Sequence, residues 1–189
     1  MHPVIESALV VAIAEIGDRT QLLSLVLSAR YRRPLAITCG ILIATIANHA
    51  LAGLIGQWIG NAVEPQRLRW ILGLSFIAMA AWALIPERLD EKQTATAKRG
   101  TAFPATLVSF FLAEIGDKTQ FATAALAARF DDVLWVVLGT TAGMMAANLP
   151  VVLMGSFASH RFDPRWARYG AAALLAAQGA LTLLGARLL

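Results

Sequence analysis

The stretch Ala14-Glu15-Ile16-Gly17-Asp18-Arg19-Thr20-Gln21 interrupts an apolar segment with charged and amide side chains, and it decides the fold. Residues 113–120 repeat it as Ala-Glu-Ile-Gly-Asp-Lys-Thr-Gln, with seven of the eight positions identical. A motif that recurs at a long, fixed offset indicates a duplicated structural unit. We therefore predict two related halves, each with one copy of the motif in its first apolar segment.

The composition places both halves in a membrane. The 189 residues are 58% hydrophobic and only 15% charged, whereas ordinary soluble domains contain about 25% charged residues. A helix needs about 20 apolar residues to cross a bilayer, and six segments approach or exceed that length. They are roughly 4–29, 35–60, 68–86, 104–128, 133–157 and 166–186. We predict an all-α membrane protein with six transmembrane helices.

The polar stretch 87–103 separates the third apolar segment from the fourth. It divides the chain into a first three-helix repeat at 1–86, a linker at 87–103, and a second three-helix repeat at 104–189. Because each repeat has an odd number of spans, the two repeats must enter the membrane from opposite sides. Inverted repeats of this kind are typical of secondary transporters, whose sites lie near the membrane midplane.

The basic residues predict the orientation. The net charge is +4, but the basic residues are spread over short loops, which argues against a nucleic-acid-binding face. Ten of the 16 Lys and Arg residues lie in the loops 30–34, 87–103 and 158–168, and four lie on the other side. The positive-inside rule therefore predicts that the linker is cytoplasmic and that both termini lie outside.

Four acids near the middle of the membrane need a reason, because each costs at least about 2.5–3.5 kcal/mol to insert. In a continuous helix the Glu and Asp of each motif, three residues apart, share one face, and the Gln three residues further on extends that stripe. We predict that the two stripes face each other as one site. The candidate metal ligands are Glu15, Asp18, Gln21, Asn48, Glu114, Asp117, Gln120 and Asn148.

Such an oxygen-rich site suits the hard cations Ca²⁺, Mn²⁺ and Mg²⁺. Four clustered carboxylates cannot all stay ionised in an empty apolar site, so some hold protons until a cation displaces them. Cation binding would then release protons, which is the physical basis of cation/proton exchange. The acids of both motifs are thus also the candidate proton-coupling residues.

Two features of the motif leave alternatives open. Arg19 and Lys118 are either gating counter-ions that bind the carboxylates of an empty site or fixed salt-bridge partners. In a simple packing element, they would instead neutralise the Glu four residues earlier in the same motif. The Gly between the acids allows either close helix approach or local unwinding. Supporting roles around the ligands are predicted for Thr20, Ser24, Thr119 and Thr123.

The sequences Glu15-Ile16-Gly17-Asp18-Arg19-Thr20 and Glu114-Ile115-Gly116-Asp117-Lys118-Thr119 resemble a family signature, E-x-G-D-(K/R)-(T/S). It belongs to the GDT-type Ca²⁺/Mn²⁺ transporters, which comprise Golgi-type cation/proton antiporters and bacterial relatives that resemble manganese exporters. The resemblance covers essentially the whole chain, in the minimal bacterial form. It implies a multi-pass protein of the bacterial inner membrane that exports Mn²⁺ or Ca²⁺ in exchange for protons, with the motif acids as ligands.

Two other functions compete with this prediction. One is an exporter of small organic cations or amino acids, which the almost purely oxygen-bearing motifs disfavour. The other is a non-transporting membrane scaffold or a metal-dependent membrane enzyme, which would need a water-accessible substrate cleft. Since the sequence has no nucleotide-binding loop or catalytic triad, we predict that the chain is not an enzyme. The predicted partners are a divalent cation as substrate, protons and the lipid bilayer, with no cofactor and no nucleic acid.

Overall fold

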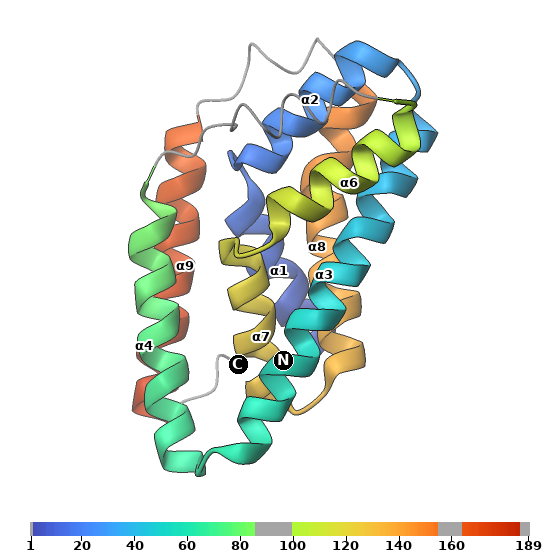
Figure 1. Ribbon diagram of the computed structural model, residues 1–189. Coiled ribbons are helices and arrows are strands. Elements are labelled where there is room, and N and C mark those ends of the chain that lie inside the picture. The colour runs from blue at the N-terminus through green and yellow to red at the C-terminus, as the bar shows by residue number, and fades with distance from the viewer. Residues whose placement is uncertain (1, 86–99, 155–163, 186–189) are drawn as a thin grey trace.

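The computed structural model describes residues 2–85, 100–154 and 164–185, and these contain eight helices and no strand (Figure 1). The all-α prediction is thereby confirmed. In chain order the helices are α1 (Pro3–Glu15), α2 (Arg19–Tyr31), α3 (Pro34–Ala62), α4 (Pro65–Ala83), α6 (Ala102–Glu114), α7 (Lys118–Phe130), α8 (Val133–Met154) and α9 (Pro164–Leu184). Most of the predicted linker at 87–103 lies outside the described residues, and α6 already begins within its last two positions.

Four of the six predicted segments correspond to one helix each, namely α3, α4, α8 and α9. The other two predictions, at 4–29 and 104–128, are wrong as continuous helices. Each of these segments breaks at its motif into two helices of 13 residues, α1 and α2 in the first half and α6 and α7 in the second. The physical reason is the Gly-Asp pair of the motif, whose geometry is described below.

Proline residues start four of the helices, α1, α3, α4 and α9. Proline suits the first helical turn because it lacks an N–H that would have no intrahelical partner there, and its fixed φ already matches the helix. The two turns that follow α2 and α7 are alike as well. Each ends on a residue with a positive φ, Arg32 at 50° and Asp131 at 51°, which turns the chain back into α3 and α8.

Two helices, α3 and α8, are long and apolar enough to cross a membrane on their own, with mean hydropathies of 1.8 and 1.7. A 13-residue helix rises only about 20 Å, which is too short for a hydrocarbon layer of about 30 Å. Placed end to end across their breaks, α1 with α2 and α6 with α7 reach that thickness.

The surface of the described residues is apolar and part of the interior is polar, as expected for a protein in lipid. Large side chains such as Leu35, Trp58 and Leu153 are mostly exposed, whereas Glu15, Asp117 and several other charged or amide side chains are fully buried. A soluble monomer rarely exposes so much contiguous apolar surface. The fold therefore agrees with the predicted membrane protein.

The two broken segments run in opposite directions through the same bundle. In Figure 1, α1 and α7 lie below the two breaks, and α2 and α6 lie above them. The second helix of each half packs against the broken segment of the other half, α8 along α1 and α3 along α6 and α7. Glycines permit these close approaches: Gly143 of α8 lies against the backbone of Ala8, and Gly56 of α3 lies against that of Ala124.

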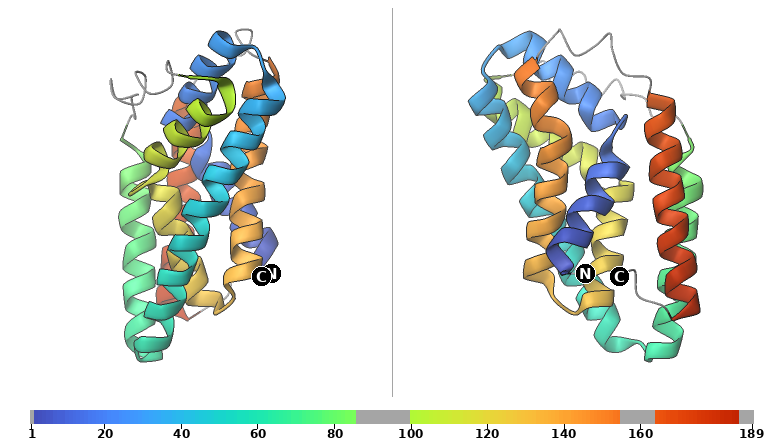
Figure 2. Two further views of the ribbon diagram at one scale, coloured as in Figure 1. Left: turned by 45° about the vertical axis from the view of Figure 1, so that its right-hand side comes forward. Right: turned by 180° about the vertical axis from the view of Figure 1, so that it is seen from behind.

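The remaining helices, α4 and α9, pair with each other at one side of the bundle (Figure 2). Gly73 and Gly179 face each other where the two helices cross. Two apolar clusters then occupy the two ends of the bundle. One is built on α1, α4, α7, α8 and α9 around Phe76 and Leu126, and the other on α2, α3, α6 and α8 around Leu27 and Phe110. The two motif breaks lie between these clusters.

Candidate cation site

The break in the first half begins where α1 ends at Glu15. Gly17 has a φ of 79°, a conformation that costs a residue with a Cβ roughly 1–2 kcal/mol and glycine nothing. Asp18 then caps α2, and its carboxylate accepts hydrogen bonds from the N–H and the hydroxyl of Thr20. Three residues thus separate the end of α1 from the start of α2.

The second copy repeats this geometry almost atom for atom. Helix α6 ends at Glu114, Gly116 has a φ of 73°, and Asp117 caps α7 by accepting hydrogen bonds from the N–H and the hydroxyl of Thr119. Of the two roles considered for the glycines, local unwinding is the one observed. The predicted stripe of Glu, Asp and Gln along one continuous helix face is wrong, because the Asp belongs to the next helix.

The glutamine of each motif stabilises the helix break in its own copy. The Oε1 atom of Gln21 accepts a hydrogen bond from the N–H of Gly17 at 2.8 Å, and that of Gln120 accepts one from the N–H of Gly116 at 2.7 Å. The Nε2 atom of Gln21 also donates to the carbonyl of Ala147 on α8 at 2.9 Å. Each amide oxygen therefore satisfies a backbone N–H that the break in the helix would otherwise leave without a partner.

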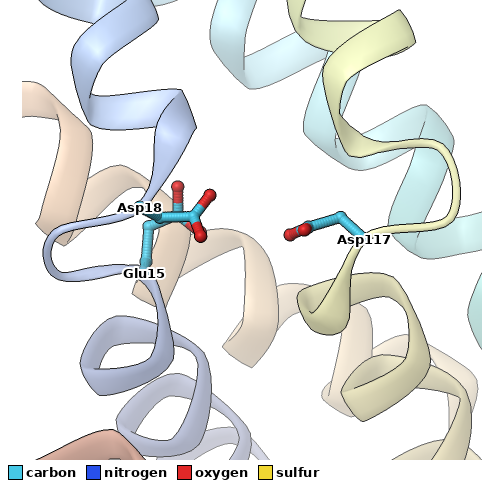
Figure 3. Close-up of side chains that lie close together, drawn as sticks. All are labelled: Glu15, Asp18 and Asp117. Atoms are coloured by element: carbon cyan, nitrogen blue, oxygen red, sulfur yellow. The ribbon is translucent and has the colours of Figure 1, made fainter. Parts of the chain in front are cut away.

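Three carboxylates from the two motif copies meet between the breaks (Figure 3). Single oxygens of Glu15, Asp18 and Asp117 lie within 4.8 Å of one another, and all three side chains are buried. Glu15 and Asp18 come from one side of the space between the breaks and Asp117 from the other. The prediction that the two motifs face each other across one site agrees with this arrangement.

The basic residues of the motifs pair crosswise between the two halves. An Nη atom of Arg19 lies 3.1 Å from Oδ1 of Asp117, and the Nζ atom of Lys118 pairs with Oδ1 of Asp18. Each basic residue is the first of its helix and reaches the aspartate that caps the other one. In the described residues, the three clustered carboxylates are thus held together by two side-chain cations.

The fourth motif acid, Glu114, is fully buried but lies outside the three-carboxylate cluster. Its Oε1 atom accepts a hydrogen bond from the hydroxyl of Thr45 at 2.8 Å, and its Oε2 atom accepts one from Nδ2 of Asn48 at 3.3 Å. Asn48 also donates to the carbonyl of Phe111 at 3.1 Å. Thr45 was missed by the sequence analysis, although it is a polar residue one helical turn before Asn48 in an apolar segment.

Glu15 has different partners. Its Oε1 atom accepts a hydrogen bond from Nδ2 of Asn148 at 3.1 Å, and Ser24 donates to Oδ1 of the same asparagine at 2.8 Å. The Oε2 atom of Glu15 is buried and has no hydrogen-bond partner among the described residues. A buried carboxylate oxygen left without a donor is costly, so this atom is free to accept a cation.

The predicted candidates thus separate into groups. Glu15, Asp18 and Asp117 converge, Arg19 and Lys118 join them, and Asn148 and Ser24 support Glu15. Thr20 and Thr119 support the aspartates from within each motif. Thr123 instead bonds to its own helix, where its hydroxyl donates a hydrogen bond to the carbonyl of Thr119 at 2.8 Å.

One buried polar cluster was not predicted at all. Glu6 of α1 pairs with Arg129 of α7 at 2.5 Å, and Nε2 of Gln178 on α9 donates to the same carboxylate oxygen at 2.5 Å. The side chains of Glu6 and Gln178 are both buried. These residues tie together three helices below the breaks, at a distance from the three-carboxylate cluster.

The carboxylate oxygens that converge here are hard donors, and the side chains of Arg19 and Lys118 neutralise part of their charge. Such a set binds divalent cations, and its buried position between two apolar clusters excludes bulk water. The arrangement can therefore bind a cation where protons and basic side chains also compete for the same oxygens.

Comparison with known proteins agrees with this chemistry. The family model described as divalent cation/proton antiporter GDT1 matches the chain twice, over residues 3–91 and 102–188, so each half matches it separately. A protein of Vibrio cholerae serotype O1 named "Putative manganese exporter" is 51% identical over 152 residues, which cover 80% of this chain and 75% of the relative. No solved structure matches the chain.

Proposed function

Because the chain belongs to the GDT1 family of divalent cation/proton antiporters, we propose that it exports Mn²⁺ from the cytoplasm in exchange for protons at the site formed by Glu15, Asp18 and Asp117. Family membership bears out the predicted divalent cation transporter and the prediction that the chain is not an enzyme. One observation carries the proposed site. It is the convergence of three buried carboxylates from both motif copies.

The proposed ligands are the carboxylate oxygens of Glu15, Asp18 and Asp117, with the unpartnered Oε2 atom of Glu15 as the first point of contact. Gln21 and Gln120 stabilise the helix breaks rather than bind the cation, since their amide oxygens accept hydrogen bonds from backbone N–H groups. Carbonyl groups freed by helix breaks commonly complete cation sites in transporters. The carbonyls around Gly17 and Gly116 are the candidates for that role.

The asparagines act on the two glutamates in this proposal. Asn148 orients Glu15, and Asn48 orients Glu114. Glu114 is only three residues before Asp117, but its carboxylate accepts hydrogen bonds from Thr45 and Asn48. It serves as the carboxyl group that exchanges a proton when a cation occupies the other three.

The crossed ion pairs supply the exchange step. In the cation-free protein, Arg19 and Lys118 neutralise Asp117 and Asp18. A divalent cation carries the same two charges as these two side chains and binds the same oxygens. Its entry therefore displaces the basic groups and any bound protons. The basic residues are gating counter-ions in this proposal, and the alternative of fixed partners is tested in the Discussion.

Access alternates between the two sides of the membrane. The opposite directions of the two broken segments support a pair of inverted three-helix repeats. The apolar clusters around Phe76 and Leu126 and around Leu27 and Phe110 lie on either side of the breaks. Each closes one path to the site, so the protein exposes the site by separating one cluster at a time.

The choice of Mn²⁺ comes from the relative whose name describes a manganese exporter. Ca²⁺ is the second candidate, since it binds the same oxygens. The proposed export and the proposed placement in the bacterial inner membrane come from the same relative, a bacterial protein named "Putative manganese exporter". The proposed orientation, with both termini outside, comes from the positive-inside rule.

Purified protein in lipid vesicles with an acidic lumen tests the proposal. We expect Mn²⁺ uptake together with alkalinisation of the lumen, and no accumulation when the pH gradient is absent. Glu15→Gln, Asp18→Asn and Asp117→Asn should each lower the uptake rate by about 10-fold or more, as ligand-shell changes typically do.

The control is Glu64→Gln, which changes an exposed carboxylate at the start of α4. It should transport at the wild-type rate. Uptake that does not depend on the pH gradient would contradict antiport. Unchanged uptake in all three motif variants would contradict the proposed site.

A further inference from the structure

The two halves differ at one buried position beside the site. In the first half, Thr45 of α3 donates its hydroxyl to Glu114. At the 99-residue offset of the motif copies the counterpart of Thr45 is Met144 of α8, and at the 100-residue offset of Asn48 and Asn148 it is Met145. A hydroxyl donor in one half is therefore replaced by a thioether in the other.

This replacement changes the partners of the motif glutamate. Both oxygens of Glu114 accept hydrogen bonds, from Thr45 and Asn48. Glu15 receives a hydrogen bond only on Oε1, and its Oε2 atom has no partner among the described residues. The half without the hydroxyl is the half whose glutamate joins the three-carboxylate cluster.

The sulfur of Met144 lies next to that glutamate. Its Sδ atom is 3.1 Å from Nδ2 of Asn148, and the same nitrogen is 3.1 Å from Oε1 of Glu15. Met144 is fully buried. The Nδ2 group of Asn148, which also lies 3.2 Å from the carbonyl oxygen of Met144, thus already lies between the thioether and the carboxylate. A cation that took the place of this donor would contact both atoms at once.

We propose that Met144 is the specificity-determining residue of this antiporter, with its thioether sulfur as a ligand that favours transition-metal ions over Ca²⁺ and Mg²⁺. This inference rests on the proposed function. Thioether sulfur is a soft donor that binds d-block ions, whereas Ca²⁺ and Mg²⁺ take oxygen ligands. Carboxylates alone suit Ca²⁺, Mg²⁺ and Mn²⁺ alike, so the sulfur adds a preference for the softer d-block ions that the motif acids lack.

The neighbouring residue provides a matched comparison. Met145 lies one position along α8, and it packs against the apolar cluster around Leu27 and Phe110. It has the same side chain in the same helix but faces a different surface. Leucine is close to methionine in volume and lacks the sulfur, so Met→Leu at either position changes packing little.

The first experiment measures Mn²⁺ uptake in vesicles with Cd²⁺ or Ca²⁺ as competitor. Cd²⁺ is a softer ion and should inhibit the wild type at lower concentrations than Ca²⁺. In Met144→Leu, we expect the ratio of the two inhibitory concentrations to move about 10-fold toward Ca²⁺. Met144→Thr, which replaces the thioether with a hydroxyl, should do the same, and Met145→Leu should keep the wild-type ratio.

A ratio taken within one preparation does not depend on how much of the variant folds. Wild-type ratios in both Met144 variants would overturn the inference while leaving the proposed function intact. Vesicles in which the wild type itself moves no divalent cation would instead contradict the proposed function.

The second experiment detects the sulfur directly. Cys39, the one cysteine of the chain, is exposed and is removed as Cys39→Ser. X-ray absorption at the cadmium edge should show a sulfur neighbour in Cd²⁺-loaded Cys39→Ser and only oxygen or nitrogen neighbours in Cys39→Ser with Met144→Leu. A sulfur neighbour that persists in the double variant would overturn the assignment of Met144.

Discussion

Lys118 and Arg19 each bring a positive charge into the middle of the bundle, and each forms an ion pair with the aspartate of the other half. Taking charged groups out of water is costly, and their attraction repays the cost only while both partners are present. The pairs therefore make the stability of the cation-free protein depend on the same aspartates that we propose as ligands of the transported cation. A gating counter-ion and a fixed structural partner can therefore be told apart by whether a bound cation restores the stability that is lost when the basic residue is removed.

Lys118→Met tests that distinction. It leaves the buried Asp18 without its ammonium partner, and breaking a buried pair costs about 3–5 kcal/mol. We expect a clear fall in the thermal midpoint of the detergent-purified protein without metal, and recovery of most of it with saturating Mn²⁺, which replaces the lost charge.

The control is Arg67→Met, which breaks an exposed pair with Glu64. Surface pairs contribute at most about 1 kcal/mol, so the midpoint should hardly move. If Mn²⁺ fails to restore Lys118→Met, the lysine is a fixed structural partner and not a counter-ion that the cation replaces.

At the scale of elements, the breaks are conformational features built by short local sequences. A glycine with a positive φ follows the first helix, and an aspartate caps the second. A Cβ added at Gly116 would meet no atom within 4 Å, and the same is true of Gly170 within α9. The two sites differ in backbone conformation, because only Gly116 has a positive φ.

Alanine at these two positions should therefore have opposite effects. Gly116→Ala places a Cβ in the left-handed region and should cost roughly 1–2 kcal/mol, with slower transport because the break positions Asp117. Gly170→Ala should stabilise α9 by roughly 0.5–1 kcal/mol, since it removes a helical glycine. Equal effects in thermal unfolding and uptake assays would show that the φ of Gly116 is not needed.

The pairing of Glu6 with Arg129 and Gln178 connects α1, α7 and α9. Arg129→Leu leaves the buried carboxylate of Glu6 without its cation and should cost about 3–5 kcal/mol. Adding Glu6→Gln removes the charge but keeps an oxygen that accepts from Gln178, so the double variant should regain more than half of that loss. A double variant no more stable than Arg129→Leu in thermal unfolding would mean that the ion pair is not what holds the three helices.

At the scale of the whole molecule, the sequence was sufficient to predict features that come from the repeat or from local apolar segments. The duplicated motif and the apolar segments predicted an all-helical chain whose two motifs meet. The uninterrupted hydrophobicity of 4–29 and 104–128 concealed the breaks, although Gly17 followed by the capping pair Asp18 and Thr20 carries a helix-start signal. Long apolar segments outweighed this local signal.

Pairing over long distances could not be predicted in the same way. Arg19 and Asp117 are 98 positions apart, and whether they meet depends on how the halves pack. Glu6 lies three residues after Pro3 in the first turns of α1 and resembles an interfacial residue, while Gln178 is one amide in an apolar helix. Their contact exists only because α9 packs beside α1.

The packing of the halves also makes the predicted orientation testable, because the two ends of α3 must face opposite sides of the membrane. Its start, next to Arg33, lies on the side predicted to be cytoplasmic, and its end precedes Glu64 on the outer side. In a Cys39→Ser background, Glu64→Cys should react with a membrane-impermeant maleimide in intact cells. Arg33→Cys should react only after the cells are opened. The reverse pattern would invert the orientation but not the direction of transport, because in cation/proton antiport an inward proton gradient drives Mn²⁺ outward whichever way the protein faces.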